Sequence, residues 1–322
     1  MTTRPVITLG DANVDLVIRL PDRGAGRADL TGSTPRLFGG GSVANVAVAL
    51  ARLGAPVSFV GVVGDDGYGR FVQADLAAEG VDTSGLCVSR DALTPMVIAL
   101  IEPSGERMNV VWPPERGADK LLAPEQVDPD AIASAAWLHT SGMVLRDSPV
   151  REAALYAMRL AHDAGVPVSL DLNLRLELWG WDDAIADTMV EAVGLADVAL
   201  GSAKEEIAPL AGTDRIEDAA RALSGGRRVV VARLGEQGAL VCDPAGNLMH
   251  VPAFPTTVVD TLGAGDAFDG GFIAARLAGC DWVEATRWGN AVAALKIARP
   301  GARGTPTRAE VLRLLGGQPA SS

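Results

Sequence analysis

The feature of this sequence that most limits its fold is the alternation of short apolar runs with longer, alanine-rich stretches. The short runs are typical of strands buried on both faces, and the longer stretches have the spacing of amphipathic helices. Strands that alternate with helices form a largely parallel sheet covered on both faces, so we expect an α/β fold. The expected strands are Val6–Leu9, Val57–Val63, Ala135–Thr140, Val166–Leu172, Val198–Leu200, Val229–Ala232 and Ala239–Cys242.

Helical spacing is found between these strands and again near the C-terminus. The expected helices are Ala44–Leu53, Gly69–Glu79, Arg151–Ala164, Ala267–Leu277 and Ala285–Ile297. No low-complexity linker or internal repeat divides the chain. We therefore expect one domain over residues 1–316, followed by a frayed tail at 317–322.

Two segments, about residues 12–38 and 94–113, interrupt this rhythm with alternating patterns and no helix. In the second segment, Val97–Ile101 and Arg107–Val111 flank a turn at Glu102–Gly105, which predicts a hairpin. The two segments together predict a small β-sheet that covers the main sheet as a lid. An exposed lid sheet also invites pairing of two copies of the chain into a homodimer.

Composition limits the partners and the compartment. The formal net charge of −12 is spread along the chain, so nucleic acid and anionic membranes are not expected partners. The three cysteines, Cys87, Cys242 and Cys280, are far apart and predict neither a disulfide framework nor a zinc site. The chain has no signal-peptide pattern at its start and no apolar run of the ~18 residues that span a bilayer. We expect a cytoplasmic protein.

The strongest local motif is a glycine turn near the C-terminus. Val258–Phe272 contains a short apolar strand, then Gly263-Ala264-Gly265, then Asp266 at the start of a helical run. Glycines permit a tight turn, and a helix N-terminus offers unpaired N–H groups to a phosphate. An aspartate at that point can accept a proton from an attacking hydroxyl. A helix cap remains a fair alternative explanation for Asp266 from these residues alone.

The string Asp-Thr-Leu-Gly-Ala-Gly-Asp at 260–266 resembles the C-terminal signature of the PfkB carbohydrate kinase family. Phe38–Gly54 and Val60–Gly69 resemble the first signature of that family, and Gly10–Asp15 and Asn290–Lys296 continue the resemblance over nearly the whole chain. The resemblance implies a three-layer, ribokinase-like α/β fold. It also implies an ATP-dependent kinase that uses Mg²⁺.

The resemblance assigns roles to individual residues. Asp266 becomes the catalytic base, and the amides of Gly263, Ala264 and Gly265 become the anion hole. The residues matching the substrate site are Asp15, Asn13, Gly40, Gly41 and Asn45. The residues matching the nucleotide site are Ser202, Leu234, Gly235, Gly238 and Asn290. Without the family pattern, Asp15 reads as a turn residue and Asn45 as a helix-surface amide.

Metal sites follow from the same resemblance, with one departure. Many members carry Asn-x-x-Glu before the nucleotide site, where the glutamate acts on Mg²⁺ through water. Here Ser202 replaces the asparagine and Glu205 keeps the acidic position, although Glu205 and Glu206 also suit a helix start. The loop Arg299–Gly304, including Ala302, together with Asp260 resembles a monovalent-cation site, which adds K⁺ as an expected cofactor.

The substrate is narrowed by a third motif. Asp171–Trp179 resembles the matching stretch of fructokinase-like and 2-keto-3-deoxygluconate-kinase-like members. Arg175, and Arg116 in Arg116–Asp119, can pair with a sugar acid or approach ATP, or form surface ion pairs. Trp112 can stack on a sugar ring or nucleobase, or cover the edge of the small sheet. A nucleoside kinase of the adenosine or inosine type remains an alternative.

The residues also bear on three alternative classes of protein. A dinucleotide-binding dehydrogenase is disfavoured because Gly39–Asn45 lacks the Gly-x-Gly-x-x-Gly pattern and does not follow the first strand. A P-loop kinase is disfavoured because the chain has no Gly-x4-Gly-Lys-Ser/Thr string. A non-catalytic ligand-binding protein of the same fold is a further alternative, against which the retained Asp266 and its glycines argue.

Overall fold

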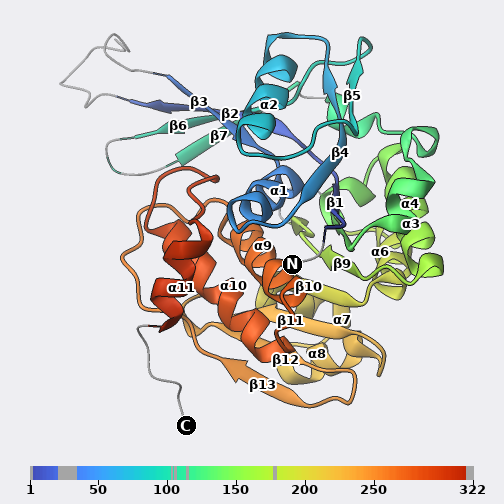
Figure 1. Cartoon of the computed structure of the whole chain (residues 1–322), viewed down its shortest axis with the longest axis vertical. Coiled ribbons are helices and arrows are strands. Elements are labelled where there is room, and N and C mark those ends of the chain that lie inside the picture. The colour runs from blue at the N-terminus through green and yellow to red at the C-terminus, as the bar shows by residue number, and fades with distance from the viewer. Residues whose placement is uncertain are drawn as a thin grey trace.

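The computed structural model describes residues 3–20, 35–102, 104, 107–113, 116–176 and 180–316. The expected tail at 317–322, residues 21–34 of the first lid segment and Trp179 of the substrate motif lie outside the described residues. The described part is built from a large sheet between two helical layers and a smaller sheet beside it (Figure 1). The predicted fold class is therefore confirmed.

The large sheet has nine strands in the order β13-β12-β11-β10-β9-β8-β1-β4-β5. Every neighbouring pair from β11 to β5 is parallel, whereas β12 and β13 are antiparallel additions at one edge. Its strands are β1 (Val6–Leu9), β4 (Val57–Gly64), β5 (Leu86–Ser89), β8 (Trp137–Ser141), β9 (Val168–Asp171), β10 (Val198–Ser202), β11 (Val229–Arg233), β12 (Ala239–Cys242) and β13 (Leu248–Val251).

Helices cover both faces of this sheet, each over its own hydrophobic cluster. One layer consists of α1 (Ser42–Arg52), α2 (Gly67–Ala78), α9 (Ala264–Leu277), α10 (Trp282–Ile297) and α11 (Arg308–Gly316). The other consists of α3 (Pro129–Ser134), α4 (Val150–Ala164), α6 (Asp183–Leu195), α7 (Ala208–Ala211) and α8 (Ile216–Ser224). None of the described helices is long and apolar enough to cross a membrane.

The continuous apolar strands serve both layers because successive side chains point to opposite faces. In β11, Val229 and Val231 belong to the cluster under α9 and α10, whereas Val230 and Ala232 belong to the cluster under α8. A continuous run of Val, Ile and Leu without a polar residue is therefore typical of strands buried on both faces.

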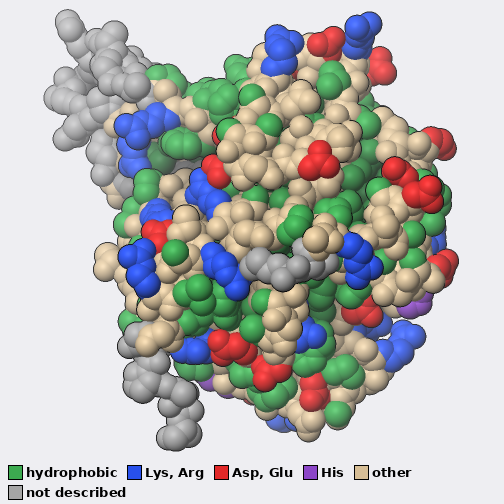
Figure 2. Space-filling view, in the orientation of Figure 1, with side chains coloured by type: hydrophobic (Ala, Val, Ile, Leu, Met, Phe, Trp, Pro, Cys, Tyr) green, Lys and Arg blue, Asp and Glu red, His purple; other side chains and the backbone are tan. Residues whose placement is uncertain are grey.

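On the outer surface, acidic and basic side chains are interspersed over the face shown in Figure 2.

The smaller sheet, here called the lid sheet, has the order β3-β2-β6-β7. Its strands are β2 (Asn13–Arg19), β3 (Arg36–Gly40), β6 (Met96–Ile101) and β7 (Arg107–Trp112). The β6–β7 pair is antiparallel, so the predicted hairpin is confirmed, while β2 and β6 pair in parallel. The chain passes through this sheet twice. It first forms β2 and β3 between β1 and α1, and it later forms β6 and β7 after β5.

The strands of the large sheet place polar side chains at one edge. The carboxyl ends of parallel strands meet at the same edge, which is where open α/β sheets bind ligands. The residues at or just beyond these ends are Asp11, Ser141, Asp171, Ser202 and Arg233. The lid sheet begins at the same edge, because β2 follows Asp11 and Ala12.

Candidate active site

Two cavities adjoin one another at this edge. A polar cavity of about 610 Å³ lies toward the lid sheet, and a second, more apolar cavity of about 640 Å³ lies toward α10. The two share a border of lining residues: Ser202, Arg233, Thr261, Ala264 and Gly265. Asp266 lines the polar cavity beside this border.

Asp266 lies in the first turn of α9, three residues after Gly263, which immediately precedes the helix. One carboxyl oxygen accepts a hydrogen bond of 2.7 Å from the Ser42 hydroxyl, and the other accepts one of 2.8 Å from the Asn45 amide. Burial raises the pKa of Asp266 to about 6, although the hydrogen bonds from Asn45 and Ser42 oppose this shift. The carboxyl group is thus fixed in orientation and titrates near the pH at which a general base works best.

Ser42 connects Asp266 to a second strand end. The Asn173 amide donates to the Ser42 hydroxyl at 3.0 Å and to the Ser141 hydroxyl at 3.2 Å. Asn173 has φ of 37°, which costs energy for a residue other than glycine and is maintained by these contacts. Neither Ser42 nor Asn173 was singled out from the sequence, although both lie inside motifs that were.

The start of α1 is stabilised by a residue from another element. Gly41, its first flanking residue, has φ of 96° and no side chain to cap the helix. Asp11 supplies the cap instead, because its carboxylate accepts from the N–H groups of Ser42 at 2.7 Å and Val43 at 3.1 Å. A Cβ on Gly41 would lie 2.5 Å from the Asp11 carbonyl oxygen, so only glycine fits there.

The structure brings most of the residues predicted to bind substrate together at the polar cavity, whereas Gly40 and Trp112 are not among its lining residues. Asp15, Asn13 and Asn45 line the polar cavity, and the Asn13 amide donates to the Asp15 carboxylate at 2.9 Å. A Cβ on Gly40 would lie 2.6 Å from that carboxylate. Asn45 is held on both sides, because its oxygen accepts from Arg303 while its nitrogen donates to Asp266. Its amide therefore orients the carboxyl group of Asp266.

Arg233 lies at the centre of a buried charge cluster. Its guanidinium donates to Asp171 at 2.6 Å and to Asp269 at 2.8 Å, and lies 3.6 Å from Glu206. Burial alone would lower the pKa of Arg233, but the three carboxylates raise it. Arg233 was not singled out from the sequence, although a lone charge that ends an apolar strand is a usable signal.

The acidic pair after β10 divides into two environments. Glu205, the residue expected to act on Mg²⁺, lines the polar cavity and is exposed. Glu206 is buried, and its carboxylate accepts from the N–H groups of Ser202 at 2.6 Å and Leu174 at 3.2 Å. Burial and the nearby Asp171 carboxylate raise the pKa of Glu206 to about 7. Among the described residues, no cluster of three or more His, Cys, Asp or Glu side chains forms a metal cage.

The apolar cavity contains most of the predicted nucleotide residues. Gly235, Gly238 and Asn290 line it together with Phe254 and Phe268, whereas Leu234 is not among its lining residues. Asn290 donates to the carbonyl oxygens of Val251 and Pro252 at 3.0 and 3.1 Å, which fixes the segment after β13. A largely apolar cavity with few polar groups suits an aromatic base.

Asp260 joins three elements at the start of the glycine turn. Its carboxylate accepts from the N–H groups of Leu262 at 3.0 Å and Gly301 at 2.9 Å. Its carbonyl oxygen accepts from the Lys296 ammonium at 2.8 Å. Ala302 packs against Gly263, where a Cβ would lie 2.8 Å from the Ala302 carbonyl oxygen. Within the turn, the Ala264 N–H donates a hydrogen bond of 3.1 Å to the Thr261 carbonyl oxygen.

The remaining candidates differ in their positions. Arg175 is exposed and lines the polar cavity. Trp112 is 48% exposed on β7 and is not among the lining residues of that cavity, to which Asn109 of the same strand contributes. Arg116 donates to the Ser148 carbonyl oxygen at 2.7 Å. Burial raises the pKa of Asp119, in the same motif as Arg116, to about 7.

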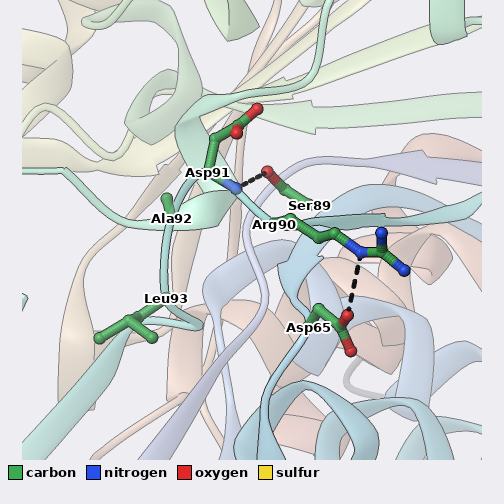
Figure 3. Close-up of a pocket in the computed structure, with 6 residues that line it drawn as sticks. All are labelled: Asp65, Ser89, Arg90, Asp91, Ala92 and Leu93. Atoms are coloured by element: carbon green, nitrogen blue, oxygen red, sulfur yellow. Dashed lines mark hydrogen bonds and ion pairs between the residues drawn. The ribbon is translucent and has the colours of Figure 1, made fainter.

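A third hollow of about 400 Å³ contains none of the predicted site residues (Figure 3). It is lined by Asp65 and by Ser89–Leu93, the segment that leads from β5 toward the lid sheet, and Arg90 pairs with Asp65 across it at 3.3 Å. Arg90 is 89% exposed, so this pair is a surface contact of small energetic value.

The chain is similar to known proteins over most of its length. Residues 4–308 match the family described as pfkB family carbohydrate kinase. A 5-dehydro-2-deoxygluconokinase from Photobacterium profundum is 33% identical over 297 residues, covering 90% of this chain and 88% of that protein. A fructokinase from Klebsiella pneumoniae is 37% identical over 271 residues, covering 83% and 82%. An aminoimidazole riboside kinase from Salmonella typhimurium is 36% identical over 269 residues, covering 83% and 79%.

Solved structures agree in fold. A fructokinase from Xylella fastidiosa with bound ATP superposes with a TM-score of 0.85 at 28% identity, covering 98% of this chain and 99% of that chain. A ribokinase II from E. coli in complex with ATP and Mg²⁺ superposes with a TM-score of 0.86 at 26% identity, covering 98% and 100%.

Proposed function

We propose that this protein transfers the γ-phosphate of ATP to a hydroxyl group of a small sugar or sugar acid, with Asp266 as general base. The proposal starts from the family: the chain belongs to the pfkB family of carbohydrate kinases and is an ATP-dependent carbohydrate kinase. The observation that carries this proposal is the position of Asp266 beside the shared border of the two cavities. A hydroxyl bound in the polar cavity can reach Asp266, while a phosphate chain entering from the apolar cavity meets the start of α9.

The chemistry asked of Asp266 is modest. Phosphoryl transfer depends mainly on positioning and on neutralising charge, so the base needs to orient the hydroxyl and accept its proton as transfer proceeds. The hydrogen bonds from Ser42 and Asn45 keep the carboxyl group in one orientation. The N–H groups at the start of α9, including that of Gly265, lie at the positive end of the helix dipole. They would stabilise the negative charge that develops on the transferred phosphoryl group.

The residues that would hold ATP and Mg²⁺ are distributed over both cavities. Gly235, Gly238 and Asn290 would border the base and ribose, and Ser202 the phosphates. Mg²⁺ is commonly held by one or two carboxylates, waters and the substrate phosphates, so the absence of a cage among the described residues is compatible with it. Glu205 has the oxygen donors for a water-mediated contact, and a bound Mg²⁺ would neutralise phosphate charge.

The proposed substrate class follows from the lining of the polar cavity. Carboxylates and carboxamides such as Asp15, Asn13 and Asn109 can each bond neighbouring hydroxyls, which is what a polyol offers. Arg175 adds a bidentate donor suited to a carboxylate. Fructose-like sugars and 2-keto-3-deoxygluconate-like acids both meet this description, and the named relatives act on compounds of these kinds.

The test is ATP-dependent phosphorylation of a panel of acceptors, with the products identified by mass spectrometry. The panel contains fructose, ribose, 2-keto-3-deoxygluconate, 5-dehydro-2-deoxygluconate, adenosine, inosine and aminoimidazole riboside. We expect the best sugar or sugar acid to exceed every nucleoside in kcat/KM by about 10²-fold or more, a ratio typical of sites whose buried polar groups would be left unpaired by the wrong acceptor. A nucleoside as the preferred acceptor would overturn the substrate class.

A paired variant separates sugars from sugar acids. Arg175→Ala is expected to raise the KM of a carboxylate-bearing acceptor about tenfold while changing that of a neutral sugar less than about twofold, since only the former loses an ion pair. Arg159→Ala, on the exposed surface of α4, is the matched control. An equal rise in KM for both acceptors would show that Arg175 instead contacts ATP or stabilises the segment that contains it.

A nucleoside kinase remains the second candidate because the aminoimidazole riboside kinase is 36% identical over most of the chain. Trp112 is the residue through which a nucleobase would stack if the lid sheet closed over it. Trp112→Ala should then reduce phosphorylation of nucleosides more than that of sugars. The acceptor panel distinguishes the two candidates directly.

We also propose that two copies pair through the lid sheet. The supporting observation is a run of exposed apolar side chains on β7: Met108, Val110, Val111 and Trp112 are 58%, 46%, 55% and 48% exposed. Light scattering should give twice the chain mass, and Val111→Lys should shift it toward the monomer. A monomer at micromolar wild-type concentration would refute this pairing.

A further inference from the structure

The glycine turn is tied to the end of α10 by a fully buried lysine. Lys296 lies in the last turn of α10 with 0% of its surface exposed, and its ammonium donates to the Asp260 carbonyl oxygen at 2.8 Å. Buried lysines are rare because removing an ammonium from water is costly unless it is compensated. A position this costly is expected to serve a purpose.

The surroundings of Lys296 suit a positive charge. The C-terminal end of a helix carries partial negative charge, which favours a cation in its last turn. The Ile297 carbonyl oxygen accepts from the N–H groups of Val259 and Asp260 at 2.8 and 3.0 Å, so the peptide leading into the turn is anchored at the same helix end. The Asp260 carboxylate then binds Leu262 and Gly301. One ammonium thus lies where α10, the turn and the following loop meet.

The residue type is informative as well. Of the 28 lysines and arginines in the chain, only Lys120, Lys204 and Lys296 are lysines. Among the described residues, this arginine-rich chain has a lysine at its most buried basic position. An ammonium is a compact point charge with three donors, whereas a guanidinium is a wide planar fork. Of the two basic side chains, the one found at this site is therefore the one closer to a compact point charge.

We propose that the Lys296 ammonium is a built-in substitute for a dissociable monovalent cation at the glycine turn, so that this enzyme does not depend on K⁺. The K⁺ expected from the sequence does not fit these residues well. The carbonyl oxygen of Asp260, a natural ligand for K⁺, already receives the ammonium. A second cation within about 4 Å of that charge would be repelled strongly in a buried site.

The consequence for the reaction is indirect, so Lys296 is a positioning residue. The ammonium fixes Asp260, and Asp260 fixes both the turn that leads to Gly263 and the loop that packs on it through Ala302. The turn in turn sets the first N–H groups of α9 and the carboxyl group of Asp266. Because the charge is covalently attached, this order is present in every molecule whatever the salt.

The first experiment needs no variant. Phosphorylation of the best acceptor is measured in KCl, NaCl and choline chloride at equal ionic strength, and ATP binding without any acceptor is measured by calorimetry in the same salts. The rates and the Kd for ATP are expected to differ by less than about twofold, since the salts then differ only in specific binding. A rate in KCl that clearly exceeds the rate in choline chloride, by fivefold or more, would overturn the proposal.

The second experiment compares two replacements of Lys296. Lys296→Ala leaves room for an ion, whereas Lys296→Met fills the space without charge. Both are expected to lose about 10²-fold in kcat, the loss typical when an anion-hole donor is disturbed. Only the alanine variant should recover activity when KCl or NH₄Cl replaces choline chloride. Lys204→Ala, which removes an exposed lysine, is the control and should respond to no ion.

The outcomes are distinguishable from one another. A folded Lys296→Ala protein with wild-type activity, or one that no ion restores, means that the lysine is only structural and refutes the proposal. If neither variant folds, the salt comparison on the wild type still decides it. The proposal rests on the proposed function only for the rate measurement. Failure to phosphorylate any sugar would refute that function, while the salt dependence of ATP binding would still test Lys296.

Discussion

The two cavities that share the border at the start of α9 are of similar volume but differ in what lines them. The polar cavity, about 610 Å³, is lined by the carboxylates and amides of residues such as Asp11, Asp15 and Asn173. The apolar cavity, about 640 Å³, is lined by Phe254, Phe268 and other apolar side chains and by glycine backbone. We therefore expect one cavity to recognise its ligand by directed hydrogen bonds and the other mainly by shape.

This difference has a consequence for specificity. A site that hydrogen-bonds a hydroxyl rejects an analogue that lacks it, because the buried polar groups are left unpaired. An apolar slot discriminates less sharply between similar flat rings. We expect strict selection of the acceptor sugar and looser selection of the nucleoside triphosphate. Substitutions within one cavity should alter the KM of one substrate, and substitutions at the border should alter kcat.

The largest effect is expected from Asp266→Asn. The amide keeps the shape of the side chain but cannot accept the hydroxyl proton, so kcat should fall by about 10³-fold or more, within the range for loss of a general base. The affinities for ATP and acceptor should change little, as steady-state kinetics and calorimetry would show. Asp163→Asn on the exposed surface of α4 is the control. Retained turnover would remove Asp266 from the mechanism.

A smaller, one-sided effect is expected from Asp15→Ala. If the Asp15 carboxylate bonds the acceptor as proposed, its loss should raise the acceptor KM by about 10- to 100-fold, corresponding to one or two lost charge-assisted hydrogen bonds. The KM for ATP should stay the same. If both KM values rise together, the two cavities are coupled and the comparison between them fails.

The pH dependence should report on the border. Because the pKa of Asp266 is raised to about 6, kcat/KM should rise about tenfold per pH unit below that value and level off above pH 7. The raised pKa of Asp266 also affects the stability of the fold, which should fall as the pH rises, whereas kcat/KM should increase. A carboxyl group whose folded-state pKa is raised stabilises the fold most below its usual value of 3.8 and loses that contribution as pH rises to about 6. A pH-independent rate between 5 and 7 would contradict the assignment.

The smallest effect is expected from Asn290→Ala in the apolar cavity. Its amide holds the Val251 and Pro252 carbonyl oxygens, so the slot should loosen and the Kd for ATP should rise about three- to tenfold, as for one neutral hydrogen-bonded contact. The acceptor KM should remain unchanged. Calorimetry with ATP and with the acceptor measures the two quantities separately, and a selective loss of acceptor binding would reverse the roles assigned to the cavities.

Much of the architecture could be predicted because it depends on local periodicity. The strand expected at Val6–Leu9 is β1, and the strand expected at Val229–Ala232 is β11 with one further residue. β5 was not predicted, because an edge strand whose residues are only partly buried lacks a continuous apolar run. The C-terminal helices were placed within a turn of their observed starts, since their glycine turn and cap residues are local signals.

The site itself was predicted less completely, and the omissions share a cause. Glu205 and Glu206 are neighbours with the same chemistry, and only the packing of Glu206 against Arg233 separates a buried acid from an exposed one. Asn45 was predicted as a substrate residue, and nothing in the sequence indicated that its amide would also contact Asp266 and Arg303, the latter 258 positions away. No local pattern encodes such distant partners.

The sequence by itself determined the alternation that makes a parallel sheet, the glycines that permit the turn at 263–265 and the aspartate at the start of α9. These features depend on backbone geometry over a few residues, and a few residues are enough to specify them. The tertiary structure decided that Ser42 and Asn45, 224 and 221 positions from Asp266, hold its carboxyl group. It also decided that Lys296 is buried against the turn. Burial and orientation arise only when distant elements pack together, and they set the pKa of a side chain such as Asp266.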